Sequence, residues 1–203
     1  MRAIILSGLL VVTMVPALES HQPARSTFVT LSGADTVQVE QFTRTATSIT
    51  GDIRFVKQQS TLHYSIVLHT DGTTEQSDVT DDDAQGKVVS SLFFGTDSIR
   101  ASGTTNGRPW SGSLVTTGKT YAHIGLSYAL MEQLVRATHP AVGDSVRVSI
   151  INIRQNLPGS PITIKRISAD SVQVGANFRV GLSRSGDVTG GINTQSNAVT
   201  TRR

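Results

Sequence analysis

Apolar and polar residues alternate along most of the chain. Residues 62–68 place an apolar side chain at every second position, and residues 172–182 do so without a break. Shorter runs of the same kind lie at 146–150 and 162–164. A period of two residues is typical of a strand with one buried and one solvated face. The pattern predicts about ten to twelve antiparallel strands of ordinary length.

One segment, LSYALMEQLVRATHP, has helical spacing instead. Its apolar stripe consists of Leu126, Leu130, Leu134 and Ala137. Ser127 is a candidate N-cap and Pro140 a stop signal, while Glu132 and Arg136 are expected to face solvent as an i, i+4 pair. The predicted fold is therefore mainly β: an antiparallel sheet curved into a half-barrel or barrel, with one amphipathic helix near residues 126–138. The helix is expected to pack on one sheet face or to plug one end of the barrel.

A short motif recurs along the chain. ADTVQV begins at Ala34 and ADSVQV at Ala169, and the core pattern Asp-Ser/Thr-Val/Ile-Gln/Arg also occurs at Asp97 and Asp144. An Asp can close a turn by accepting a hydrogen bond from a backbone N–H two residues further on. We interpret the motif as a strand entry in which the β-branched residue points into the core and the long polar residue points out.

The first twenty residues resemble a secretory signal peptide. A basic start precedes an apolar run from Ala3 to Val15, and small residues suitable for cleavage follow near positions 17–20. The apolar run is shorter than the ~20 residues that span a bilayer. Residues 21–203 are then predicted to form a single β-rich domain, periplasmic or secreted, that is not transmembrane in its mature form. The chain contains no cysteine, so no disulfide stabilises it.

The charge distribution argues against nucleic acid as a partner. Residues 21–99 carry ten acidic and five basic side chains, whereas residues 100–203 carry four and twelve. The arginines are spread over the strands, and aromatic residues make up 5% of the chain, so a basic face with stacking platforms is not expected.

The sequence contains no recognisable motif for catalysis, cofactor binding or metal binding. GKT at Gly118–Thr120 lacks the spacing of a phosphate-binding loop, and the five histidines lack zinc-ligand spacing. The acidic run at residues 78–83 could bind calcium loosely, but we interpret it as a solvated, flexible hairpin end. We therefore predict no catalytic residue, no metal site and no cofactor, and an enzyme is the less favoured class.

Three segments carry a resemblance to other proteins. DTVQVEQFTRT, YALMEQLVRA and ADSVQV with the later SGDVTGGI together resemble uncharacterised exported β-rich proteins of environmental bacteria. At the level of the fold, the chain is similar to bacterial half-barrel carriers, in which a curved antiparallel sheet holds an apolar ligand under a helix. That resemblance implies an architecture and brings no known activity with it.

Two functions follow as leading hypotheses. The first is an exported carrier that binds a lipid or another amphiphile in the cell envelope. The second is an interaction module that presents a sheet face or edge to another envelope protein, and a hydrolase-associated domain is a third. For a carrier, the candidate ligand-binding residues are Tyr64, Arg108, Trp110, Phe178 and Arg179, with Ile66, Leu68 and Val180 on the apolar wall and Arg184 near the head group.

Overall fold

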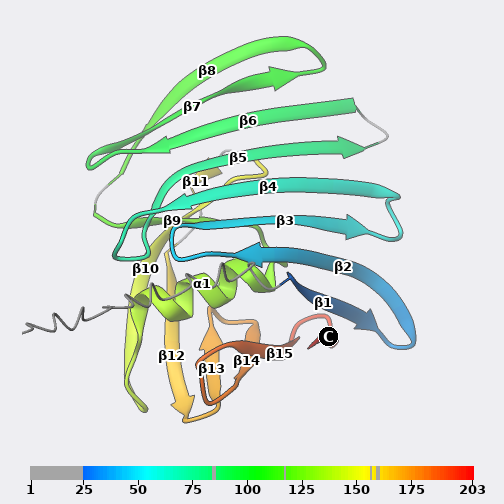
Figure 1. The fold of residues 1–203 in the computed structure, drawn as a ribbon, viewed down its shortest axis with the longest axis vertical. Coiled ribbons are helices and arrows are strands. Elements are labelled where there is room, and N and C mark those ends of the chain that lie inside the picture. The colour runs from blue at the N-terminus through cyan, green and yellow to red at the C-terminus, as the bar shows by residue number, and fades with distance from the viewer. Residues whose placement is uncertain (1–24, 84–85, 117, 156, 159–160) are drawn as a thin grey trace, which may run out of the picture.

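The chain forms one strongly curved, open sheet with a single helix in its hollow (Figure 1). The computed structural model describes residues 25–83, 86–116, 118–155, 157–158 and 161–203. The expected signal peptide at residues 1–20 lies outside these residues. The predicted class, mainly β with a half-barrel sheet and one helix, is confirmed.

Sixteen strands and one helix make up the described part of the chain. They are β1 (Arg25–Ser32), β2 (Asp35–Arg44), β3 (Ser48–Phe55), β4 (Ser60–Leu68), β5 (Thr74–Asp83), β6 (Gly86–Phe94), β7 (Ser98–Thr105), β8 (Arg108–Val115), β9 (Thr120–His123), α1 (Tyr128–Thr138), β10 (Ser145–Asn152), β11 (Leu157–Pro158), β12 (Ile162–Ser168), β13 (Ser171–Val174), β14 (Phe178–Leu182), β15 (Val188–Asn193) and β16 (Ala198–Arg202).

The strands pair mostly with their sequence neighbours. The order across the sheet is β11-β10-β12-β13-β14-β15-β16-β1-β2-β3-β4-β5-β6-β7-β8, with β9 added beside β10. The antiparallel pairing of β1 with β16 joins the two halves of the chain. The sheet does not close, so β8 remains at one of its edges.

The helix belongs to a crossover connection. β9 and β10 pair in parallel, whereas every other pair in the described sheet is antiparallel. A parallel pair needs a long connection, which is usually helical. α1 supplies that connection, and this explains why one helix interrupts a meandering β protein. Ser127 caps it as predicted, and it ends at Thr138, with His139 as the C-cap directly before Pro140.

All four copies of the motif lie at the start of a strand, as expected. Asp35 is the first residue of β2, and Asp97, Asp144 and Asp170 directly precede β7, β10 and β13. The expected orientation holds for Ile99 and Val172, which are fully buried. It fails in β2, where the side chain that enters the core is Gln38.

Two interpretations from the alternation pattern were wrong. Residues 172–182 form the hairpin β13–β14, because Gly175 adopts φ +62° and starts a three-residue loop between Val174 and Phe178. The acidic run at 78–83 is the second half of β5. It does end at a hairpin, where Asp83 pairs with Gly86, but it is part of an ordered strand and is not solvated throughout. Within it, Asp78 accepts a hydrogen bond from Ser91 (2.5 Å), and buried Asp81 pairs with Arg154 (2.6 Å).

A continuous hydrophobic core fills the hollow. It combines the inner faces of β3 and β4 with those of β10, β12, β13 and β14, and α1 lies between the two sets. Figure 1 shows α1 with β2 and β3 on one side and β12 to β15 on the other. The functional groups described next lie around this helix.

Candidate functional site

The first two turns of α1 are buried on every side. All eight residues from Tyr128 to Val135 are inaccessible or nearly so, including the polar pair Glu132 and Gln133. A helix on a protein surface normally keeps one polar face in water. Here the curved sheet surrounds the helix, so its polar side chains require partners inside the protein.

A buried carboxylate accepts hydrogen bonds from the N-terminus of α1. Glu40 on β2 accepts hydrogen bonds from the Ser127 hydroxyl (2.5 Å), the Tyr64 hydroxyl (2.8 Å) and the backbone N–H groups of Tyr128 (2.8 Å) and Ala129 (3.2 Å). The helix dipole and its unpaired N–H groups favour a negative charge at this end. Burial nevertheless raises the pKa of Glu40, because the charged form has lost its water.

A glycine on the neighbouring strand makes this arrangement possible. Gly51 pairs with Tyr64 across β3 and β4. A Cβ atom at position 51 would lie 2.6 Å from the Tyr64 hydroxyl oxygen. Only glycine therefore leaves room for the tyrosine ring to cross β3 and reach Glu40.

The inward orientation of Glu40 follows from its pairing partners. Glu40 lies opposite Phe28 of β1 and Ile53 of β3, and both of these side chains are buried. Residues directly opposite each other share one face of a sheet. Gln38 and Glu40 thus point inward, and Gln38 donates a hydrogen bond to the Leu126 carbonyl oxygen (3.0 Å), just ahead of α1.

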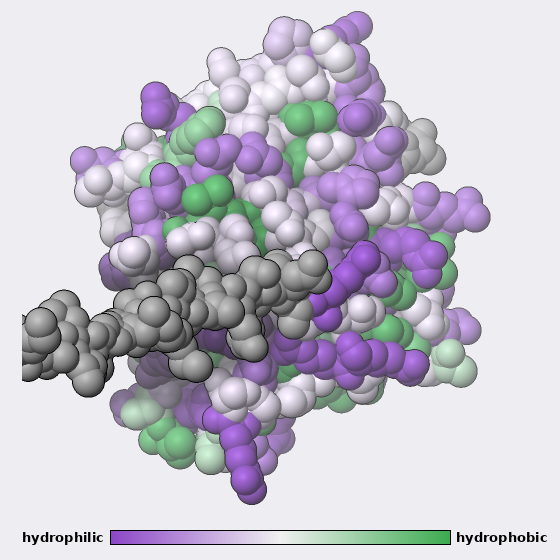
Figure 2. Space-filling model, viewed as in Figure 1, coloured by the Kyte–Doolittle hydropathy of each residue, from purple (hydrophilic) through white to green (hydrophobic). Residues whose placement is uncertain are grey.

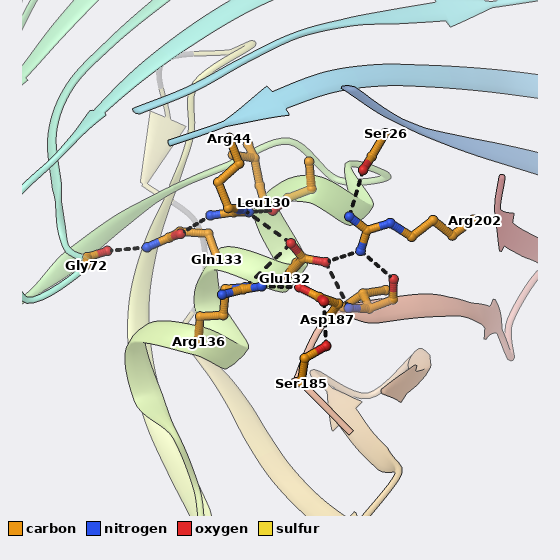
Figure 3. A network of polar contacts seen from close by, with 12 residues as sticks. Ser26, Arg44, Gly72, Leu130, Glu132, Gln133, Arg136, Ser185, Asp187 and Arg202 are labelled. Carbon is orange, nitrogen blue, oxygen red and sulfur yellow. Dashed lines mark hydrogen bonds and ion pairs between the residues drawn. The ribbon is translucent and has the colours of Figure 1, made fainter. Parts of the chain in front are cut away.

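Glu132 is the second buried carboxylate, and Figure 3 shows the groups around it. Its Oε1 atom lies 3.2 Å from Arg44 Nε and 3.5 Å from Arg136 Nε. Its Oε2 atom accepts hydrogen bonds from Arg202 Nη1 and from the Val188 backbone N–H, both at 2.8 Å. The predicted i, i+4 pair with Arg136 exists, but the prediction that Glu132 faces solvent was wrong, because α1 lies inside the sheet.

Arg44 connects this carboxylate to the first turn and the middle of α1. Its guanidinium donates to the Ala129 carbonyl oxygen (2.8 Å) and to the Gln133 side chain, and Gln133 donates in turn to the Gly72 carbonyl oxygen (2.7 Å). Burial lowers the pKa of Arg44, whereas the nearby Glu132 raises it. An arginine remains charged at neutral pH under such conditions.

The network contains more positive than negative charge. Three arginines, Arg44, Arg136 and Arg202, surround Glu132, and the other acidic member is Asp187, which pairs with Arg136. The Ser185 hydroxyl and Arg136 lower the pKa of Asp187, so it is ionised at neutral pH. Three cations against two carboxylates leave the network with one excess positive charge.

A cleft of about 370 Å³ opens beside this network. We call it the helix-end cleft. It is lined by Arg44, Thr45, Ala46, Leu68, His69, Thr70, Asp71, Gly72, Gln133, Arg136, Ala137 and His139. Its one carboxylate, Asp71, already pairs with Lys119 (2.7 Å). The cleft therefore suits an anionic group.

A second, larger depression of about 640 Å³ lies on the outer face of β2 to β5. His63 Nδ1 and Asp52 Oδ1 are 2.5 Å apart within it, and Arg25 donates to Gln41 (2.6 Å). These side chains are exposed and satisfy one another. The depression is open and polar, and it is separated from the helix by the sheet.

The structure disperses the residues that the sequence suggested for ligand binding. Tyr64 lies in the core, and Phe178 packs edge-on against Tyr128 (6.5 Å between ring centroids). Arg179 lies on the outer face of β14, where its Nε is 3.5 Å from the Ser171 hydroxyl oxygen. Arg108 and Trp110 lie on β8, at the edge of the sheet. The exposed Arg184 is in the turn after β14.

The polar groups around α1 were missed because their signals are weak or distant. Gln38 and Glu40 share one face of β2 with the apolar Phe42. This spacing of two residues is a local signal that the two polar side chains point inward. Arg44 and Arg202 reach Glu132 from positions 88 and 70 residues away along the chain. No local pattern reveals such a meeting.

Comparisons with known proteins support the fold. No family model and no curated protein matches the chain. Among solved structures, it is similar to a DUF1089 family protein from Pseudomonas aeruginosa, with 15% sequence identity and a TM-score of 0.59 over 77% of this chain and 89% of the other. A likeness at this identity extends to the architecture alone.

Proposed function

We propose that this protein is an exported binding protein for an anionic amphiphile of the cell envelope, with no catalytic role. The head group binds in the helix-end cleft, and the apolar chain enters the hollow of the half-barrel. One observation carries the proposal. The network formed by Arg44, Arg136 and Arg202 has an excess positive charge, and it lies next to a cleft at the end of an apolar hollow. Ligand sites typically combine an apolar wall with a few polar groups of this kind.

The hollow is occupied by α1, which therefore acts as a plug. The apolar residues Leu130, Met131 and Leu134 of α1 fill the hollow together with inward side chains of the sheet such as Ile66 and Val180. The chain of a ligand would replace some of these contacts, so binding requires α1 to shift. Such a shift would have to break the polar contacts that hold the helix at Glu40 and Glu132.

No described helix is long and apolar enough to cross a membrane. Among the described residues, no group of three or more His, Cys, Asp or Glu side chains is arranged to hold a metal ion. The proposal needs no such ion, because the arginines supply the positive charge.

Charge changes at Thr70 test the proposal. This side chain is exposed and lines the helix-end cleft without belonging to the network. We expect Thr70→Glu to weaken binding of an environment-sensitive fatty-acid probe roughly fivefold, since one added charge changes such an interaction by about 1 kcal/mol. Thr70→Lys should strengthen binding by a similar factor, and added salt should reduce both effects.

Gln58 provides a matched control. It is exposed in the turn between β3 and β4, outside the cleft, so Gln58→Glu and Gln58→Lys should leave the affinity unchanged. Saturable binding that responds at Thr70 and not at Gln58 supports the proposal. No saturable binding across several chain lengths, or equal effects at both positions, contradicts it.

A further inference from the structure

Strand β8 ends the sheet with an unpaired edge. The strand order stops at β8, and no other strand of the described residues pairs with its far side. Figure 1 shows β8 at the top of the molecule with β7 below it. An edge of eight residues presents a row of backbone N–H and C=O groups that can pair with another strand.

The hairpin fixes which of these groups face outward. Asn106 and Gly107, both with positive φ, form a two-residue turn that is closed by the pair Thr105 and Arg108. The backbone groups of residues 108, 110, 112 and 114 therefore point toward β7, and those of 109, 111, 113 and 115 point to the free edge. Pro109 lacks an N–H on the free side, where it breaks no bond within the sheet.

The exposed edge is poor in charge. From Trp110 to Val115 it carries no ionisable side chain, and Val115 is 89% exposed. Figure 2 shows mostly pale residues, neither strongly hydrophilic nor strongly hydrophobic, over the top of the molecule. On the inner face, Trp110 and Leu114 are partly buried against the core, and Gly112 between them has open space around its Cα. Edge strands are usually protected by charges, prolines or bulges. In β8 such features, Arg108 and Pro109, lie at the start of the strand, and residues 110–115 carry no charge or proline.

We propose that β8 pairs with β8 of a second copy of this chain, antiparallel and about a two-fold axis at Gly112. The side chains select this register. Trp110 then faces Leu114 of the second copy on the inner face, and Leu114 faces its Trp110. Ser111 and Ser113 oppose each other on the outer face and exchange backbone hydrogen bonds. The free backbone groups of β8 are thereby paired with those of the same strand in the second copy, as a two-fold interface requires.

Pairing of single strands gives a modest interface. About six backbone hydrogen bonds form in this register. The contact buries less than the ~1,200 Å² of a standard stable complex. The dimer is therefore concentration-dependent, and its formation is independent of amphiphile binding in the helix-end cleft.

A single introduced cysteine tests the register. The chain has no cysteine, and a Cβ atom at Gly112 meets nothing within 4 Å. At the axis, residue 112 of one copy lies opposite residue 112 of the other, at a separation that a disulfide spans. Mild oxidation of Gly112→Cys should give a cross-linked dimer rapidly. Arg108→Cys lies on the same exposed strand far from the axis, and it should cross-link far more slowly.

A second variant removes the pairing itself. Ser113→Pro deletes an N–H on the free edge and leaves the bonds to β7 intact, whereas Ser113→Thr keeps that N–H. In sedimentation velocity at increasing concentration, wild type and Ser113→Thr should shift toward a dimer and Ser113→Pro should remain a monomer. Monomers throughout, with no preference of Gly112→Cys over Arg108→Cys, overturn the proposal and leave the edge to a strand from another protein.

Discussion

At the scale of single residues, the decisive feature is the pair of buried carboxylates that hold α1. Glu40 receives the start of the helix, and Glu132 binds Arg44 and Arg202 from two distant strands. Burying a charged pair costs solvation free energy that a well-packed apolar pair does not. The main effect of these contacts is thus to fix the position of α1, and their net contribution to stability is smaller. Removing one partner nevertheless leaves the others buried and unpaired.

We predict that Glu132→Gln destabilises the fold by about 3 kcal/mol, because it leaves three arginines without their shared counter-charge. Urea unfolding measures the change. Glu75→Gln is the matched control, since Glu75 is 55% exposed on β5 and has one distant partner, His69, at 3.9 Å. An effect of Glu132→Gln no larger than that of the control would mean that the network does not hold the helix.

At the scale of elements, the two copies of the repeated motif have nearly the same sequence but turn opposite faces toward the core. Offset by 135 residues, Val37 aligns with Val172, yet Val37 is half-exposed and Val172 is fully buried. Both copies lie beside a β-bulge, but the extra residue is Val37 itself in the first copy and Ile167 of the partner strand in the second. In β2, Gln38 and Glu40 face the helix instead. The motif therefore specifies the start of a strand and leaves its facing to the pairing partner.

This difference is testable with one substitution at two aligned positions. We expect Val172→Lys to cost about 3 kcal/mol, since it places an unpaired charge in the core. Val37→Lys should cost less than about 1 kcal/mol, because its side chain reaches water on the outer face. Thermal unfolding of both variants provides the comparison. Equal losses at the two positions would show that the two strands face the core in the same way.

Local signals explain what could be predicted from the sequence. Period-two alternation identified β4 and β10, and Ser127 and Pro140 marked the ends of the helix within two residues. Strands of two to four residues, such as β9 and β11, are too short to show a period, and the unbroken alternation over 172–182 hid the turn between β13 and β14. The described residues therefore contain sixteen strands where ten to twelve were expected. The helix was expected on a sheet face or at a barrel end, since spacing alone does not reveal that a sheet surrounds it.

At the scale of the whole molecule, the crossover β9–α1–β10 places a helix inside an open half-barrel. The same sheet leaves a cationic cleft at one end of the helix and an unpaired edge at β8. The cleft underlies the proposed binding of an anionic amphiphile, and the edge underlies the proposed dimer. Both depend on the curvature of one sheet, although they use different parts of it.

The central claim is that α1 is a plug that shifts when ligand binds. Hydrogen exchange of the α1 backbone amides, with and without saturating oleate, tests this most directly. We expect faster exchange between Tyr128 and Val135 in the bound form, with the amides of β12 and β13 unchanged as an internal reference. Saturable oleate binding with the exchange of α1 unaltered would contradict it.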